Sequence, residues 1–243
     1  PAQGDDVYQD GADLSVALEG AKAADGAQFE NLTLGAAATA KVVDTVDTVT
    51  ATLSANPTSV AEGGEITYTI TLSNTTGAPL DQHGELTFKL ANGEEIVIKA
   101  GEVTGSITVP VADDAFVGGQ PAIENSIVGE PTMDGGVAFE KLETAGAPSV
   151  QVTDEPGSGN PGDPDNQGDA ITISIKADKA EFAENEEQTF TVSIDKAVDR
   201  DVVVTLDGGK TVTIKANETE VTYTRPAQGD DVYQDGADLS VAL

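Results

Sequence analysis

The sequence predicts an all-β chain of tandem antiparallel sandwiches, and three observations support this prediction. Short segments alternate polar and apolar residues, as strands do when one face is buried. No segment carries an apolar stripe at the 3.6-residue period of a helix. The chain also repeats itself, because Pro1–Leu18 returns unchanged as Pro226–Leu243. An identical repeat of this length indicates a tandem array, and such arrays more often provide length or multivalency than catalysis.

The individual strands are short and are separated by turn residues. Ala91–Gly93 and Asp207–Gly209 each stand between two alternating segments, at the spacing of a β-hairpin. About seven short strands in roughly 105 residues is the pattern of an antiparallel immunoglobulin-like sandwich. The clearest predicted strands are Glu65–Leu72, Leu86–Leu90, Glu95–Lys99 and Ser106–Val111.

The repeat contains two divergent units, which are recognised by three aligned pairs of segments. Each pair places the same alternation and the same acidic residues at matching positions, so the units share one fold. The aligned pairs are Thr50–Asn74 with Thr172–Asp195, Leu86–Asp114 with Val202–Asp231, and Gly135–Asp154 with Gly26–Asp44.

These alignments predict four parts of the chain. Residues 1–44 are the C-terminal part of a split immunoglobulin-like unit, and residues 45–155 are a complete unit. Residues 156–168 form an acidic linker rich in Gly and Pro. Residues 169–243 are the N-terminal part of the split unit.

Composition excludes several classes of function. The chain has 43 Asp and Glu against 12 Lys and Arg, a net charge of -31, so it lacks the basic footprint that nucleic acid requires. Cysteine is absent, which excludes disulfides, thiolate zinc sites and cysteine nucleophiles. No apolar run approaches the roughly 18 residues of a membrane span.

Acidic residues gather at the ends of predicted strands, at matching places in both units. In the complete unit Glu62 precedes the second strand, Asp113 and Asp114 follow the fifth, and Asp154 with Glu155 closes the unit. These turns can meet at one pole of a sandwich. The matching residues elsewhere are Asp5, Asp6, Asp44, Asp47, Glu184, Asp230 and Asp231.

Carboxylates packed this closely repel one another unless a cation lies between them. Calcium accepts six to eight oxygen ligands in flexible geometry, whereas magnesium requires a stricter octahedron. Zinc prefers His and Cys, and the chain has one His and no Cys. The acidic turns therefore predict Ca²⁺ sites. Ordinary Asp turns on an acidic surface remain the alternative for each pair taken alone.

Two stretches carry a family resemblance. SVAEGGEITYTITLS with SITVPVADDAFVGGQ, and EFAENEEQTFTVSI with TYTRPAQGDDVYQDG, resemble the Calx-β pattern. With the long repeat, the acidity and the lack of Cys, the chain is similar to the extender region of large bacterial RTX adhesins. The likeness covers essentially the whole chain.

The resemblance implies a calcium-stiffened extracellular stalk at the bacterial cell surface, exported by type I secretion and serving adhesion and biofilm formation. It implies calcium ligation by Glu62, Asp113, Asp114, Asp154 and Glu155 in the complete unit. In the split unit it implies ligation by Glu184, Asp230 and Asp231, with Asp44 from a neighbouring repeat. The family's further Glu after the Asp pair is missing, so Asp10 and its copy Asp235 are only candidates, as are Asp163, Asp165 and Asp169 in the linker.

Catalysis is not expected. Paired carboxylates can serve a glycosidase, but such enzymes need an aromatic-lined cleft and this chain has six Phe, four Tyr and no Trp. His83 stands alone in DQHGE, which favours a surface loop over a catalytic base. A glycan-, surface- or ice-binding module is the alternative to a spacer, and Thr ladders or aromatic platforms would favour it.

The expected partners are neighbouring identical repeats. The C-terminal fragment, residues 169–243, lacks final strands that residues 19–44 of another molecule can supply. We therefore expect head-to-tail complementation between molecules.

Overall fold

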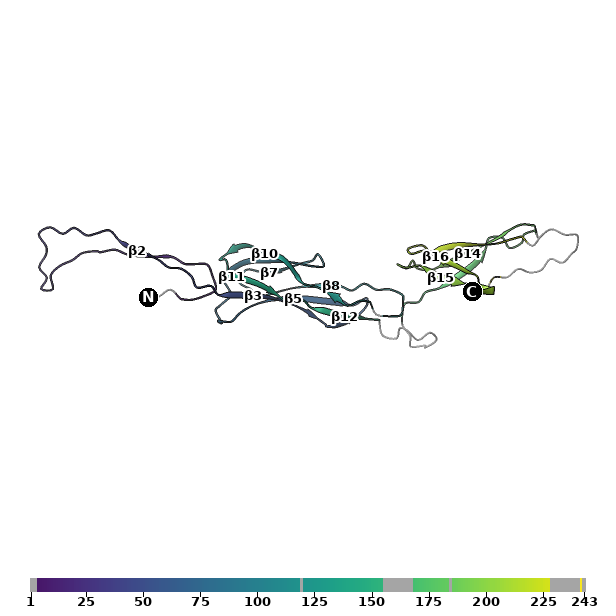
Figure 1. The fold of residues 1–243 in the computed structure, drawn as a ribbon, viewed down its shortest axis with the longest axis horizontal. Coiled ribbons are helices and arrows are strands. Elements are labelled where there is room, and N and C mark those ends of the chain that lie inside the picture. The colour runs from purple at the N-terminus through teal and green to yellow at the C-terminus, as the bar shows by residue number, and fades with distance from the viewer. Residues whose placement is uncertain (1–3, 119, 155–167, 184, 228–240, 242–243) are drawn as a thin grey trace. The chain divides into compact units, whose positions relative to one another are not determined.

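The structure is a computed structural model that describes residues 4–118, 120–154, 168–183, 185–227 and 241. The described part is all-β, as predicted, with one short 3₁₀ turn and no α-helix (Figure 1). None of its helical segments has the length and apolar character needed to cross a membrane.

Contacts within the chain divide it into two compact units. The loops around Glu62 and around Asp113 and Asp114 group with the second unit, although the strands that they join belong to the first. The first compact unit comprises Pro1–Val60, Gly64–Val111 and Pro121–Val152, and the second comprises Ala61–Gly63, Ala112–Gln120 and Thr153–Leu243.

The first compact unit contains a β-sandwich. A four-stranded sheet of order β11-β3-β5-β8 and a three-stranded sheet of order β10-β6-β7 contribute to one apolar core, and a third sheet has the order β4-β12-β9. The strands are β3 (Thr48–Asn56), β4 (Ser59–Ala61), β5 (Glu65–Asn74), β6 (His83–Leu90), β7 (Glu95–Ile98), β8 (Thr104–Pro110), β9 (Ile123–Glu124), β10 (Ile127–Gly136), β11 (Lys141–Ala145) and β12 (Ser149–Thr153).

Alternation along the strands explains this core. In β5, Ile66, Tyr68, Ile70 and Leu72 are each at most 4% exposed, while the residues between them point to the other face. Successive side chains of a strand face opposite sides of the sheet, so one face of β5 is apolar and the other carries Thr. The same alternation buries Leu86, Phe88 and Leu90 of β6.

One pair of strands departs from the antiparallel prediction. β11 pairs with β3 in parallel, with Lys141 opposite Thr48 and Ala145 opposite Thr52. β10 also carries an irregularity between Val128 and Thr132, where its register against β6 shifts. Neither feature follows from the hydrophobic alternation, because alternation defines which face is buried and not the direction of the neighbouring strand.

The second compact unit repeats part of this arrangement. Its three-stranded sheet has the order β13-β14-β17, and β15 pairs with β16. Val192, Ile194, Val204, Leu206 and Ile214 form its core. The strands and turn are β13 (Ile173–Ala177), β14 (Gln188–Ile194), β15 (Val202–Thr205), η1 (Asp207–Gly209), β16 (Thr211–Ile214) and β17 (Glu220–Arg225).

A separate hairpin precedes the sandwich in the chain. β1 (Asp13–Val16) pairs antiparallel with β2 (Ala38–Lys41), and every residue of both strands is exposed. Leu14, Val16 and Phe29 are 55%, 64% and 57% exposed. These apolar side chains have no core of their own.

Candidate metal centre

The first acidic turn, defined here as Glu62, Asp113, Asp114 and Asp154, continues the ends of three strands. Glu65 at the start of β5 lies opposite Pro110 at the end of β8, so the loops before β5 and after β8 leave the sheet at one edge. The Glu62 N–H donates to the Thr153 carbonyl at 2.8 Å, which joins the end of β12 to the same place. Strand register therefore gathers residues that lie far apart in the sequence.

Glu62 organises this turn from a buried position. Its side chain is 5% exposed, and Oε2 accepts hydrogen bonds from the Asp114 N–H at 3.2 Å and from Gln120 Nε2 at 3.0 Å. The carboxylate of Asp113 lies against Gly63, where a Cβ would come within 3.5 Å of Asp113 Cγ. The structure thus brings together the Glu and the Asp pair that the sequence predicted to be neighbours.

Asp154 and Asp114 complete the first acidic turn. Asp154 Oδ2 accepts from the Gly118 N–H at 2.9 Å, whereas Asp154 Oδ1 is shielded from solvent and has no hydrogen-bond partner. Asp114 Oδ1 accepts from the Phe116 N–H at 2.8 Å, and Asp114 Oδ2 lies 3.0 Å from Arg200 Nη2. A shielded carboxylate oxygen without a donor is an unsatisfied acceptor that a hard cation can ligate.

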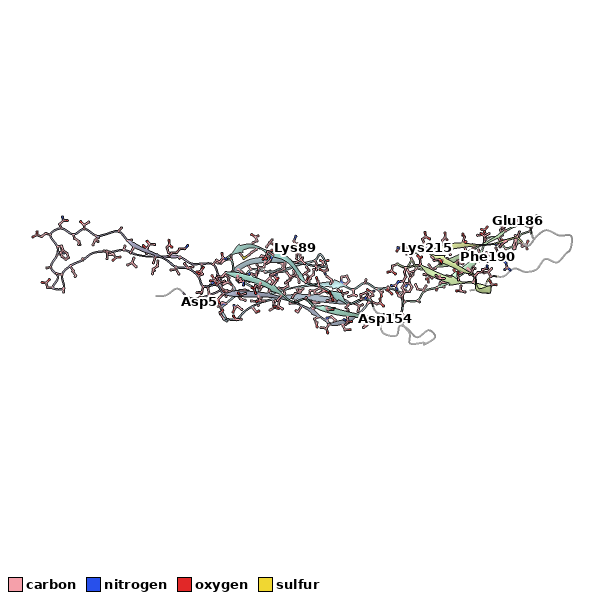
Figure 2. The ribbon with its side chains drawn as sticks, in the orientation of Figure 1. Asp5, Lys89, Asp154, Glu186, Phe190 and Lys215 are labelled. Atoms are coloured by element: carbon pink, nitrogen blue, oxygen red, sulfur yellow. The ribbon has the colours of Figure 1, made fainter. Side chains whose placement is uncertain are left out.

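The second acidic turn, defined as Asp5, Asp6, Asp10, Asp44 and Glu140, surrounds a cavity of about 140 Å³. Figure 2 shows Asp5 beside the start of β3. Thr45 Oγ1 donates to Asp5 Oδ1. Asp47 contacts the turn through its backbone, since its N–H donates to Glu140 Oε2 at 2.5 Å.

The two turns are built alike. Asp6 Oδ1 accepts from the Tyr8 N–H at 2.7 Å, as Asp114 Oδ1 does from Phe116. Asp44 Oδ2 accepts from the Gly11 N–H at 3.1 Å, as Asp154 Oδ2 does from a glycine N–H. The second Asp of the pair therefore closes its own turn, while the terminal Asp ties that turn to the last strand.

Several predicted ligands lie outside the described residues. These are Glu155, Glu184, Asp230 and Asp231, together with Asp163 and Asp165 of the linker and Asp235. Asp169 is described, and its Oδ1 lies 3.5 Å from Lys196 Nζ.

The acidic turns differ in how well they fit a cation by geometry and by donor chemistry. Within the described ranges, no group of three or more His, Cys, Asp or Glu side chains converges as a ligand set. The donor chemistry nevertheless suits calcium rather than zinc, because both turns offer only carboxylate, carbonyl and hydroxyl oxygens. The unpartnered Asp154 Oδ1 and the carboxylate-lined cavity are the structural features that fit such an ion.

Sequence reasoning missed Glu140, Thr45 and Gln120 as members of these turns. Glu140 follows Phe139 just as Glu30 follows Phe29 in the aligned segment, so the shared Phe-Glu was an available signal. Gln120 follows the Asp pair, and its side-chain amide donates to Glu62, whose carboxylate would repel an acidic residue there.

The surface position predicted for His83 is wrong. His83 is 2% exposed, and its Nδ1 and Nε2 lie 2.6 Å and 2.8 Å from the carbonyl oxygens of Gly84 and Glu102. It also packs against Phe139, with ring centroids 5.5 Å apart. The motif around His83 does not reveal this burial, because the burial comes from the pairing of His83, at the start of β6, with Gly136 of β10.

Comparison with known proteins places the chain in one family. The LapA domain family matches residues 47–155 and again residues 169–243, which together make up more than half of the chain. No curated protein matches the chain. LapA is a large adhesin, and the all-β fold agrees with a non-enzymatic structural protein. The chain therefore belongs to the LapA domain family and is a cell-surface adhesin-related module.

Proposed function

We propose that the chain is a structural extender module of a secreted bacterial RTX adhesin, with Calx-β-like sandwiches. Calcium bound at the acidic turns stiffens the array of sandwiches, and the array projects a distal binding domain from the cell surface. Type I secretion exports the parent protein, and its adhesion contributes to biofilm formation.

The observation that carries this proposal is the repetition of one acidic turn. Asp6 with Asp44, and Asp114 with Asp154, have the same hydrogen-bonding roles, although their segments have diverged in sequence. A net charge of -31 makes each such cluster unfavourable without cations. Repetition of an unfavourable arrangement indicates that it serves a purpose, and oxygen-only donors favour calcium.

The second acidic turn also joins two sequence units. Asp5, Asp6 and Asp44 belong by alignment to the split unit, whereas Glu140 belongs to the complete unit. A cation in this cavity would be held from both sides of the short connection at Thr45. Two sandwiches bridged in this way cannot swing freely.

With the expected affinity, the sites would change from empty to calcium-bound when the chain leaves the cell. Extracellular calcium modules bind with Kd of about 10⁻⁴ to 10⁻³ M, so such sites are empty in the cytosol and filled outside the cell. The chain is then pliable during secretion and stiff at the surface.

Calorimetric titration of the whole chain tests this proposal. We expect CaCl₂ to bind with Kd in the range of about 10⁻⁴ to 10⁻³ M and MgCl₂ to bind more weakly. Asp44→Asn should remove binding at the second acidic turn, while Glu130→Gln, an exposed change on β10, is the matched control. Absence of calcium binding to the unmodified chain would sink the proposal.

A glycan- or surface-binding module is the second candidate, favoured by one observation. The outer face of β3, β5 and β8 carries hydroxyl side chains in cross-strand rows, such as Ser54, Thr69 and Ser106. Thr67 and Thr108 hydrogen-bond each other at 2.9 Å in this face, which leaves fewer groups for a ligand. Binding of the chain to a glycan array, abolished by Thr69→Val, would favour this candidate over a spacer.

We also propose that copies of the chain associate head to tail. Phe29 is 57% exposed, whereas Phe139 at the aligned position is 7% exposed in a core. Among the described residues β13 pairs only with β14, while its counterpart β3 lies between β11 and β5. The segment around Phe29 in one molecule can therefore cover the free edge of β13 in another.

Light scattering after gel filtration tests this association. We expect mass to rise with concentration, and Phe29→Ala to reduce that rise. A monomer at every concentration would exclude complementation between copies.

A further inference from the structure

Val7 and Tyr8 directly follow the Asp pair of the second acidic turn and are almost fully buried. Their exposed fractions are 0% and 1%, and both belong to the core of the β3–β12 sandwich. By alignment, however, Asp5 and Asp6 belong to the preceding split unit. Two side chains of one sequence unit thus fill the core of its successor.

Backbone and side-chain contacts both fix Tyr8. Its ring stacks on Phe139, with centroids 5.3 Å apart and an interplanar angle of 21°. Its hydroxyl oxygen accepts a hydrogen bond from the Gln82 N–H at 2.9 Å. The Gln9 N–H donates to the Ala138 carbonyl at 2.8 Å, and the Glu140 N–H donates to the Val7 carbonyl at 2.9 Å.

The ring and the hydroxyl group of Tyr8 contact an aromatic ring and a backbone N–H, and neither of these contacts involves a carboxylate. Burial raises the pKa of the Tyr8 hydroxyl above its ordinary value, an effect that the hydrogen bond from Gln82 partly offsets. Stacked aromatic rings and buried apolar area are stabilising by themselves. The packing of Tyr8 is therefore stabilising without a cation, whereas the carboxylates beside it repel one another unless a cation is bound.

We propose that apolar residues after an Asp pair form a latch that docks one unit onto the next, independently of calcium. The latch residues are Val7 and Tyr8, which enter the core of the β3–β12 sandwich, and Phe116 is the aromatic residue after the Asp113–Asp114 pair. The partner surface lies on the unit that follows in the chain. In the β3–β12 sandwich this surface consists of the loop before β6 and of Phe139, which precedes β11. The sequence copy of Tyr8, Tyr233, lies outside the described residues.

The second latch supports this proposal through a matching contact. Phe116 is half-buried, and the Arg200 guanidinium carbon lies 4.1 Å from the centroid of its ring. Arg200 aligns with Gly84, which follows the His83 that packs on Phe139. The aromatic residue after each Asp pair thus contacts the sequence unit that follows, Tyr8 at Gln82 and Phe116 at Arg200, whose aligned position is two residues beyond Gln82.

Full-chain variants test the latch in calcium and in chelator. Tyr8→Ala should lower the Tm of the β3–β12 sandwich by roughly 5–10 °C in EGTA as well as in calcium. Amide exchange at Gln9 and Glu140 should speed up at least tenfold. Tyr8→Phe keeps the stacked ring and should retain most of the stability. The matched control is Val203→Ala, which removes an exposed apolar side chain from β15 and should leave both readouts unchanged.

Two results would overturn the latch. One is an unchanged Tm and unchanged exchange for Tyr8→Ala in EGTA. The other is an effect of Tyr8→Ala that appears only with calcium, since Tyr8 would then only support the acidic turn. Loss of folding in Tyr8→Ala is resolved by Tyr8→Leu, which fills the space without a ring and should give an intermediate Tm.

Discussion

Asp154 shows most clearly how a single residue at the acidic turns can respond to calcium. One carboxylate oxygen holds Gly118 in place, and the other is shielded and unpartnered. Figure 2 shows the residue where the chain leaves β12. The first oxygen positions the turn, and the second is available to a cation.

Asp154→Asn should therefore separate these two roles. The amide oxygen can still accept from Gly118, but the charged ligand is lost. We expect the calcium-dependent rise in stability that comes from the first acidic turn, about 2.7 kcal/mol at a hundredfold excess over Kd, to disappear. In chelator the variant should be at least as stable as the natural chain, because one of several like charges is gone. Urea unfolding measures the stability with calcium and with chelator, and Glu130→Gln is the control. An Asp154→Asn variant that keeps the full calcium effect would contradict the role of Asp154 as a calcium ligand.

Asp201 makes the stability of the second compact unit depend on pH. The hydrogen bond from Lys215 Nζ at 2.7 Å, followed by that from the Ala216 N–H, lowers the pKa of the Asp201 carboxyl in the folded chain. The pKa of Asp201 is lower in the folded chain than in the unfolded chain. The stability that ionised Asp201 gives the folded unit is therefore complete above the ordinary Asp pKa of about 3.9, and it is lost as the pH falls through the lowered pKa. The ionised carboxylate is thus the stabilising form.

Asp201→Asn should lower the Tm of the second compact unit at pH 7 and have little effect at pH 2. The difference between variant and natural chain therefore shrinks on acidification, as thermal unfolding at the two pH values measures. A difference that grows as the pH falls would show that the sign is wrong. Lys210→Gln, a charge removal on the same unit, is the control.

Strand packing at the element scale depends on one glycine of β6. A Cβ at Gly84 would lie 2.1 Å from the Asp134 carbonyl oxygen and 2.2 Å from that of Gly135, both on the paired strand β10. Gly84→Ala should therefore force the two strands apart and destabilise the sandwich by about 2–4 kcal/mol. Gly35→Ala, where nothing lies within 4 Å, should be near neutral. Equal stability of the two variants in urea would contradict this packing.

Alternating strands could be predicted from sequence, and irregular ones could not. The predicted strand Glu65–Leu72 is β5, extended to Asn74, and the strand predicted at Leu86–Leu90 begins at His83. β10 was missed because IVGEPTMDGG contains a Pro, three Gly and no alternation. Its pairing with β6 comes from tertiary contacts rather than from local propensity.

The acidic turns were only partly predictable for a related reason. Glu62 and the Asp pair stand beside strong strand signals, so register alone brings them together. Glu140 reaches the second acidic turn through the loop before β11, whose parallel pairing with β3 no sequence pattern indicated. The apolar latch was missed because Tyr8 lies in a loop, where apolar residues carry no periodic signal.

Charge governs the behaviour of the whole molecule. A net charge of -31 opposes compact packing of neighbouring units, and both the proposed calcium ions and the proposed apolar latch act against that repulsion. Calcium neutralises the carboxylates, whereas the latch buries apolar surface. The two devices respond differently to chelator, so they can be measured separately.

The central claim, that calcium stiffens this chain, is tested most directly by X-ray scattering in solution, with and without chelator. With calcium we expect a larger maximum dimension and a Tm higher by roughly 5–10 °C, because bridged units are held at fixed angles. With EGTA the maximum dimension should fall as the junctions loosen, and magnesium should not restore it. Identical scattering profiles and identical Tm values in calcium and in EGTA would contradict a structural role for calcium.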